Sequence, residues 1–308
     1  MLKKLLFAVV ALVVAATVFY VGFPEKFAEV AVNAERSRSQ LVRKETDTDG
    51  GLHWVYLEGG SGEPLVLIHG FGADKDNWTR TARFLTPHYH VIAPDLQGFG
   101  ESSKSQTASY TIDAQVETVH AFVQKLGLKN VHLGGSSMGG NISAAYAAKY
   151  PNEVQSLWLV GPAGIATVGP SELQKITASG GKNPLVSKTR EEFYEVSKFV
   201  MTNPPFIPKA VLNVMADRRI ANFELEQRIF KEIRSSPPLE GQIAGLATPT
   251  HVLWGDHDRA LNYEGAQVFV RLMPHASATI MPGIGHLPMV EKPREAAEDY
   301  INFRSQLK

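Results

Sequence analysis

The chain has 308 residues, of which 44% are hydrophobic, enough for one large α/β domain with an insertion or for two smaller domains. Lysine and arginine total 31, as do aspartate and glutamate, so the charge balance favours neither nucleic acid nor a strongly charged partner. The absence of cysteine excludes disulfides and thiolate metal sites.

The first predicted element is an uncharged apolar run over residues 5–23. As a helix it would span about 28 Å, close to the thickness of a bilayer core. A cleaved signal peptide is the alternative, since Val14-Ala15-Ala16 resembles a small-residue cleavage site. The run continues past that site without a polar break, so we interpret residues 1–23 as a single-pass transmembrane anchor. Lys3 and Lys4 favour a cytoplasmic N-terminus, which places the remaining chain on the periplasmic side of an inner membrane.

Residues 24–45 are predicted to form a juxtamembrane helix, with the clearest pattern over 24–41. Its apolar positions recur at helical spacing: Phe27, Val30, Ala31 and Ala34. Such a face can lie on lipid, pair with another copy of the chain, or pack on the rest of the molecule, and the sequence does not choose among these.

Small residues within the anchor suggest self-association. Ala11 and Ala15 form a small-xxx-small pair, and Ala8 and Gly22 add further small positions. This spacing lets two transmembrane helices approach closely, so we predict a homodimer held mainly by residues before about Leu41. The alternative is that the alanines simply face lipid.

From about Leu52 onwards, short apolar runs alternate with helical patterns. The predicted strands cover residues 52–57, 64–68, 90–93, 131–133, 154–160, 250–254 and 276–281. The predicted helices among them cover residues 76–85, 111–126, 141–148 and 294–307. This alternation predicts an α/β fold with a mostly parallel sheet and helices on both faces, built from residues 46–161 and 241–308.

Residues 162–240 interrupt the alternation and carry helix signals instead. Ser171 with Gln174 and Thr189 with Glu192 are capping-box patterns. We therefore predict a helical cap inserted into the sheet domain. Its best candidates for an apolar pocket roof are residues 204–208, Val211, Leu212, Val214 and Met215. The alternative is that these residues form ordinary core between cap helices.

A Gly-x-Ser-x-Gly motif lies between a predicted strand and a predicted helix. The residues are Gly135-Ser136-Ser137-Met138-Gly139, followed by Gly140. In a nucleophile elbow, a sharp strand-to-helix turn lifts the serine to the edge of the sheet, and small neighbours let two backbones approach. Ser137 fits the nucleophile position better than Ser136. If Ser136 were the nucleophile, Met138 would occupy the position after it that needs a small residue. The simpler alternative is a serine that caps the helix.

A serine hydroxyl needs a base, and the base needs an acid that fixes its tautomer and stabilises its cation. Parallel sheets gather such groups at the carboxyl ends of their strands. Ser137, Asp258 and His286 each follow a predicted strand, in the order serine, acid, histidine. His69 also ends a strand, and its place before Gly70 suggests a loop-stabilising role. The histidine spacing does not suggest a metal site.

The oxyanion of the reaction also needs hydrogen-bond donors. In this arrangement one donor is the backbone amide after the nucleophile, at Met138. The second comes from the loop after an earlier strand, where Phe71 is the candidate. The positions of the two backbone amides would matter more for this role than the side chains of Phe71 and Met138.

These motifs resemble the α/β-hydrolase family, in particular its lipase and esterase branch. The resemblance rests on residues 69–72, 135–140, 254–258 and Gly285-His286, and it covers the chain from Leu52 onwards. It assigns the triad acid to Asp258 rather than Asp256, and it implies neither a metal nor an organic cofactor. The anchor and residues 209–230 are similar to membrane-anchored monoacylglycerol lipases, and the whole chain is similar to bacterial membrane-bound phospholipases A1.

The sequence therefore predicts a membrane-anchored serine carboxylic-ester hydrolase that acts on acyl glycerolipids. Carbon–carbon bond hydrolases and cofactor-free haloperoxidases share the triad and remain alternatives within the fold. Dehalogenases and epoxide hydrolases are disfavoured, because they use aspartate where this chain has Ser137. A non-catalytic lipid-binding module is the alternative from a different class.

Overall fold

The computed structural model describes residues 1–307, without the side chains of residues 2, 8, 11–13, 15 and 16. The strands are β1 Val42–Asp47, β2 His53–Gly59, β3 Pro64–Ile68, β4 His90–Pro94, β5 Val131–Ser136, β6 Val154–Val160, β7 Thr250–Gly255 and β8 Ala276–Met281. The helices are α1 Leu2–Gly22, α2 Pro24–Arg38, the 3-10 helix η1 Lys75–Trp78, α3 Thr79–Leu85, α4 Ile112–Lys125, α5 Met138–Lys149, α6 Glu172–Ala178, α7 Arg190–Val200, α8 Lys209–Ala221, α9 Phe223–Arg234, α10 Glu240–Ile243, α11 Gly265–Leu272, α12 Pro288–Glu291 and α13 Pro293–Ser305.

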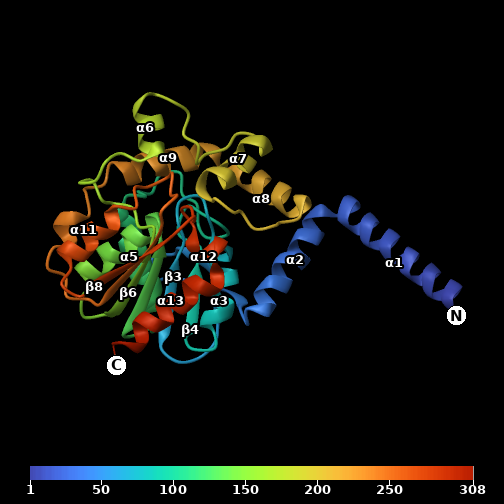
Figure 1. Cartoon of the computed structure of the whole chain (residues 1–308), viewed down its shortest axis with the longest axis horizontal. Coiled ribbons are helices and arrows are strands. Elements are labelled where there is room, and N and C mark those ends of the chain that lie inside the picture. The colour runs from blue at the N-terminus through green and yellow to red at the C-terminus, as the bar shows by residue number, and fades with distance from the viewer. Residues whose placement is uncertain (308) are drawn as a thin grey trace.

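The strands form one sheet in the order β1-β2-β4-β3-β5-β6-β7-β8 (Figure 1). β2 pairs antiparallel with both β1 and β4, and the strands from β4 to β8 are parallel. Every residue of β5 is buried, as expected for a central parallel strand covered by helices on both faces. The predicted α/β fold with a mostly parallel sheet is confirmed, and the predicted bounds of β3, β6 and β8 match the structure.

Two apolar clusters fill the space above and below the sheet. On one face, α4, α5 and α11 supply side chains such as Phe122, which stacks on Trp54 with ring centroids 4.6 Å apart. On the other face, α3 packs against α13, where Tyr300 stacks on Trp158 at 4.8 Å. Loss of such a buried aromatic ring typically costs about 3–5 kcal/mol of stability. The sheet is therefore a rigid base for the loops at its edges.

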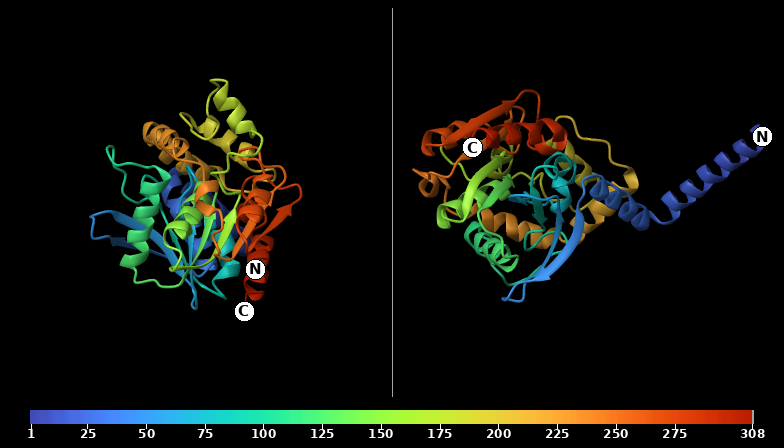
Figure 2. Two further views of the ribbon diagram at one scale, coloured as in Figure 1. Left: turned by 90° about the vertical axis from the view of Figure 1, so that its left-hand side faces the viewer. Right: turned by 90° about the horizontal axis from the view of Figure 1, so that it is seen from below.

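The helices from α6 to α10 lie between β6 and β7 in the chain, and α6 to α9 gather at one end of the sheet (Figure 2), whereas α10 packs against α5 and α11. Ser171 caps α6 in a complete capping box with Gln174, and the Thr189 side chain caps α7. Of the residues expected to roof a pocket, Val211 is buried, on a helix that also packs against α2, whereas Phe206 in the proline-rich loop before α8 is 84% exposed. Phe206 therefore does not line an enclosed pocket, and the rest of the expected roof stays a prediction.

The first helix, α1, projects away from the body of the molecule (Figure 1). Among the residues whose side chains are described, no helix is long and apolar enough to cross a membrane. The predicted small-residue contact at Ala8, Ala11 and Ala15 involves side chains outside the described set.

The second helix packs on the rest of the molecule. α2 lies against α8 and α3, with Ala28 buried, and Arg36 pairs with Asp76 at 2.5 Å. The prediction of helix throughout residues 24–45 is wrong at its end, because α2 stops at Arg38 and β1 begins at Val42. β1 is an edge strand with almost no buried side chains, so it carries no apolar alternation that the sequence could display.

Candidate active site

Ser137 lies at the turn between β5 and α5 with a strained backbone, at φ 55° and ψ −117°. A left-handed φ is uncommon for a residue with a side chain and persists only where the surroundings enforce it. The turn is tight enough that a Cβ on Gly135 would lie 2.2 Å from the carbonyl oxygen of Gly139. The glycines are therefore required by backbone approach, as in a nucleophile elbow.

The loop after β6 lies against both Ser137 and His286. The Ser137 amide donates to the Val160 carbonyl at 2.9 Å, and the Ala163 amide donates to the Ser137 carbonyl at 2.9 Å. Between them, a Cβ on Gly161 would lie 3.3 Å from Nδ1 of His286. One short loop thus positions the serine turn beside the histidine. Within residues 1–307, the Ser137 hydroxyl and the His286 ring are not hydrogen-bonded to each other, and such bonds often tighten only when substrate binds.

His286 is buried in the loop after β8 and faces a carboxylate. Its Nδ1 lies 2.6 Å from Oδ2 of Asp258, whose side chain is fully buried. A carboxylate oxygen accepts, so Nδ1 carries the proton and Nε2 is left as the acceptor. The pair therefore presents one basic imidazole nitrogen at the carboxyl ends of the strands.

Other donors hold Asp258 in place. The indole Nε1 of Trp254 donates to Oδ2 at 2.7 Å, and the amides of Ala260 and Leu261 donate to Oδ1 at 2.8 and 2.9 Å. These hydrogen bonds satisfy a buried carboxylate that would otherwise be costly to desolvate. Asp256 instead accepts from the Gly283 amide at 2.7 Å. The structure thus brings Asp258, and not Asp256, to the His286 ring.

His69 supports the loop after β3. Its Nε2 accepts from the Leu96 amide at 2.9 Å, so Nδ1 carries the proton and donates to the Gly70 carbonyl at 2.8 Å. Burial lowers the pKa of His69 to about 4, and the ring is therefore neutral near neutral pH. The expected loop-stabilising role of His69 agrees with these contacts.

Phe71 and Met138 bring two backbone amides to the serine turn. Met138 is the first residue of α5, where helical amides have no partner within the helix. Gly70 brings the Phe71 loop close, since a Cβ on Gly70 would lie 3.1 Å from Cβ of Ser137. Among the described residues, neither amide donates to a backbone carbonyl outside regular elements. Both amides therefore lie in segments next to Ser137 without such a bond.

The inserted helices contact the site loops directly. The His286 amide donates to the carbonyl of Val200, at the end of α7, at 2.8 Å. Glu291 accepts from the Gly285 amide at 2.8 Å and from the Asn203 amide at 2.7 Å, so it joins the histidine loop to the insertion. The Phe71 ring packs edge-on against Phe230 of α9, with centroids 5.2 Å apart. Movement of the insertion would therefore disturb both loops.

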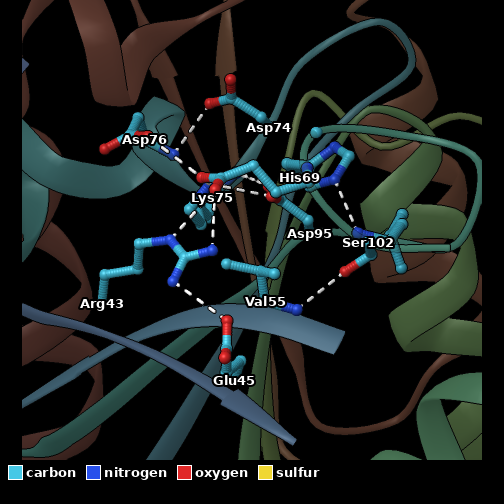
Figure 3. Close-up of polar contacts among 12 residues, drawn as sticks. Arg43, Glu45, Val55, His69, Asp74, Lys75, Asp76, Asp95 and Ser102 are labelled. Carbon is cyan, nitrogen blue, oxygen red and sulfur yellow. Dashed lines mark hydrogen bonds and ion pairs between the residues drawn. The ribbon is translucent and has the colours of Figure 1, made fainter. Parts of the chain in front are cut away.

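A buried ionic network lies beneath the β3 loop (Figure 3). The Lys75 ammonium, with a side chain only 2% exposed, donates to Asp95 at 2.8 Å and to Glu101 at 2.7 Å. Burial opposes the charged form of Lys75, but the surrounding aspartates outweigh it and raise its pKa. Burial likewise opposes ionisation of Glu101, yet hydrogen bonds from Arg43 and Lys75 lower its pKa to about 2. The network fixes the turn after β4, from which the Leu96 amide reaches His69.

Sequence reasoning missed several of these supporting residues. The roles of Trp254, Glu291 and the Lys75–Asp95 pair depend on contacts that no local pattern displays. Only Trp254 had a signal, because it opens the motif that contains Asp258. Among the described residues, no group of three potential ligands is arranged to hold a metal ion.

The sheet order, the elbow and the insertion between β6 and β7 define an α/β hydrolase. The family described as alpha/beta hydrolase fold matches residues 63–203. Lipase 1 of Psychrobacter immobilis is 46% identical over 90% of this chain and 88% of its own length. Monoacylglycerol lipase ABHD6 of Homo sapiens is 31% identical over 78% of this chain and 74% of its own.

A solved structure resembles the whole molecule. The crystal structure of a membrane phospholipase A, described as a bacterial virulence factor, superimposes with a TM-score of 0.90 at 41% identity. The match covers 100% of this chain and 99% of that one. The chain belongs to the α/β-hydrolase family, and it is an ester hydrolase of the lipase and esterase type.

Proposed function

We propose that this protein hydrolyses carboxylic esters of acyl glycerolipids through a triad of Ser137, His286 and Asp258. The observation that carries the proposal is the 2.6 Å contact between Asp258 and His286 beside the strained turn of Ser137. The acid fixes the histidine tautomer, and the free Nε2 is the base that the serine requires.

The proposed reaction proceeds in two halves. His286 Nε2 takes the proton from Ser137 Oγ, which attacks the ester carbonyl carbon, and the same nitrogen then protonates the leaving alcohol. Water enters, His286 deprotonates it, and its oxygen attacks the acyl-enzyme carbonyl. Collapse of this second intermediate releases the carboxylic acid and returns the proton to Ser137. Asp258 stabilises the imidazolium that forms in each half.

In both halves the amides of Phe71 and Met138 would stabilise the oxyanion. Donors aimed at developing charge are commonly worth about 10²- to 10³-fold in kcat each. The Met138 amide also lies at the N-terminus of α5, where the helix dipole favours negative charge. The backbone supplies these donors, so the proposal requires no metal or organic cofactor.

The acyl glycerolipid substrate is inferred from two features. The relatives include a protein named monoacylglycerol lipase and one described as a membrane phospholipase A. In this chain, the insertion brings an apolar cluster around Phe199, Val200 and Ala260 next to the histidine loop, where Leu287 packs on it. Apolar walls beside a triad suit an acyl chain. Phospholipid and monoacylglycerol are the two headgroup classes to compare.

The first experiment labels the protein with a fluorophosphonate and then profiles its substrates. We expect one adduct on Ser137, none in Ser137→Ala, and release of fatty acid from defined phospholipids and monoacylglycerols, read by mass spectrometry. Absence of an adduct on the folded protein would favour a lipid-binding module. Labelling without ester hydrolysis would favour a carbon–carbon bond hydrolase or a haloperoxidase.

We also propose that α1 anchors the protein in the inner membrane with the hydrolase on the periplasmic side. The helix has 21 residues, about 31 Å in length, and its described apolar side chains are mostly exposed. Tyr20, near its end, accepts a hydrogen bond from the Ala210 amide at 3.2 Å, and the exposed Phe206 lies in the loop just before α8. Aromatic side chains near the end of a membrane-anchoring helix are typical of the interface between the bilayer and water.

The anchor is tested by comparing the 308-residue chain with one that begins at Ser39. Ser39 is kept because its buried hydroxyl donates to the Thr79 carbonyl at 2.7 Å. We expect the longer chain to resist alkaline extraction from membranes and the shorter chain to be soluble and active on short-chain esters. Complete extraction of the longer chain would contradict the proposed anchor.

The homodimer is proposed to use α1 and the part of α2 that remains exposed. Val30 and Ala34 are exposed on α2, while Phe27 packs edge-on against Tyr20 at 4.9 Å and Ala28 is buried. Cross-linking in membranes should give a dimer of the 308-residue chain and none of the chain beginning at Ser39. A dimer that persists in the shorter chain would place the interface in the hydrolase domain.

A further inference from the structure

Arg219, in the last turn of α8, links the helical insertion to the loop after β3. Its Nη1 donates to the Gly72 carbonyl at 2.5 Å, and its Nη2 donates to the Leu185 carbonyl at 2.7 Å. Its Nε and Nη2 also donate to the two carboxylate oxygens of Glu226 at 2.6 and 2.7 Å. One guanidinium therefore joins α8, α9 and the Phe71 loop.

Glu226 holds this guanidinium in one orientation. It lies in the first turn of α9 with a side chain only 4% exposed, and burial raises its pKa although Arg219 opposes the change. A bidentate arginine–carboxylate pair has a fixed planar geometry, and a desolvated pair resists separation because each charge would be left unpaired. Arginine at a helix C-terminus and glutamate at a helix N-terminus also suit the two helix dipoles.

Gly72 is shaped to receive this contact. Its φ is 68°, and a Cβ there would lie 2.4 Å from Nη2 of Arg219, so the guanidinium packs directly on the backbone. Gly72 follows Phe71, the proposed oxyanion donor. On the other side of Phe71, the Gly70 carbonyl accepts from His69. The Gly70 carbonyl belongs to the same peptide as the Phe71 amide, and the Gly72 carbonyl lies two peptides further along the loop. The loop that carries the donor is thus held by one contact from the core and one from the insertion.

We propose that Arg219 is a positioning residue for the oxyanion hole. It holds the Gly72–Ala73 peptide at the end of the loop after β3 and thereby restrains the direction of the Phe71 amide, so the helical insertion helps to complete the active site. This inference rests on the proposed role of Phe71 and extends it to Arg219, which is 147 positions from Gly72 in the sequence. The effect belongs mainly to the transition state, because the oxyanion forms only there.

The test compares Arg219→Met with Arg190→Met as a matched control. Arg190 makes a similar bidentate pair with Asp217 of α8, at 2.7 and 2.6 Å, but it is exposed and does not contact the site loops among the described residues. Kinetics are measured on p-nitrophenyl butyrate, with active sites counted by fluorophosphonate labelling and folding followed by thermal unfolding.

We expect Arg219→Met to lower kcat per labelled site about 10- to 100-fold, with KM changed less than about threefold, a smaller loss than removal of the oxyanion donor itself. Arg190→Met should keep kcat within about twofold. A purely structural role would reduce the number of labelled sites and leave kcat per site unchanged, which would overturn the proposal. An equal loss in both variants would also overturn it.

Arg219→Lys covers the case in which Arg219→Met does not fold. Lysine keeps the charge beside Glu226 but cannot reach Gly72, Leu185 and both carboxylate oxygens together, so kcat should fall about 3- to 10-fold. Unchanged kcat in this variant would overturn the proposal. Failure of the proposed triad is seen separately, because Ser137→Ala would then retain activity whatever Arg219 does.

Discussion

Two buried histidines at the same edge of the sheet have different partners. His286 follows β8 and faces the carboxylate of Asp258 at 2.6 Å. His69 follows β3 directly, and both of its ring nitrogens are engaged by backbone groups. Only the histidine beside a carboxylate gains support for a cationic ring, whereas backbone contacts of this kind hold the neutral ring. The neighbours, rather than the residue type or the strand position, separate a base from a structural support.

The largest effect should follow from removing either reacting group. Ser137→Ala and His286→Ala should each lower kcat by about 10⁴-fold or more, because nucleophile and base act as one unit. His88→Ala, at an exposed position, should leave kcat unchanged. Ester hydrolysis and thermal unfolding are measured together. More than about a tenth of wild-type activity in a folded triad variant would contradict the mechanism.

The carboxylate that distinguishes the two histidines is tested next. Asp258→Asn should lower kcat by about 10⁴-fold, since an amide allows the wrong imidazole tautomer. Asp256→Asn should cost less than about tenfold, because among the described residues the Asp256 carboxylate contacts the Gly283 amide and an exposed neighbouring histidine rather than His286. The comparison uses kcat on the same ester. The reverse ranking in folded proteins would assign the acid to Asp256.

Replacing His69 should mainly lower the stability of the fold, with a much smaller effect on catalysis than replacing His286. His69→Phe keeps a ring of similar shape but leaves the Leu96 amide without its present partner, whereas the Gly70 carbonyl keeps its hydrogen bond from the Ala73 amide. An unpaired buried group costs about 1–3 kcal/mol, so the free energy of unfolding should fall by about that amount. Activity should fall about 10- to 100-fold as the Phe71 loop loosens, far less than in His286→Ala. A loss as large as that of His286→Ala would make His69 part of the chemistry.

The sequence predicted the features that have a local cause. The central strands are buried on both faces, so β3 and β6 stand out as apolar runs, and the glycines around Ser137 mark a tight turn. β1 was missed because an exposed edge strand has no apolar face to display. The outward turn of Phe206 was also missed, since composition does not fix the direction of a proline-rich loop.

The supporting residues of the site were not predictable for a different reason. In the sequence, Arg219 is indistinguishable from an ordinary surface arginine near the end of a helix, and Lys75 from a surface lysine. Their contacts with Gly72 and Asp95 arise only when the insertion and the β4 turn fold onto the β3 loop. The reacting groups sit in recognisable motifs, whereas the groups that orient them are spread along the chain.

The smallest predicted effect is a difference between the wild type and His69→Phe in how the free energy of unfolding depends on pH. Burial lowers the pKa of His69 to about 4, and burial together with Arg304 lowers that of His132 to about 4. Histidine in an unfolded chain titrates near 6.5, so between about pH 6.5 and 4 the unfolded state binds more protons than the native state. The stability contributed by the neutral rings is therefore fully present above about pH 6.5 and is lost as pH falls towards 4.

Comparison with His69→Phe isolates the contribution of the His69 ring to this pH dependence. His132 and the carboxylates are present in both proteins and contribute equally to the pH dependence of each. One proton of difference corresponds to about 1.4 kcal/mol per pH unit. Urea unfolding at pH 5 and pH 6 should thus show wild-type stability falling more steeply with acid than that of His69→Phe, by close to that amount. Equal slopes in the two proteins would mean that His69 binds its proton alike in the native and unfolded states. The ring would then be available as a base, and the distinction from His286 would rest on Asp258 alone.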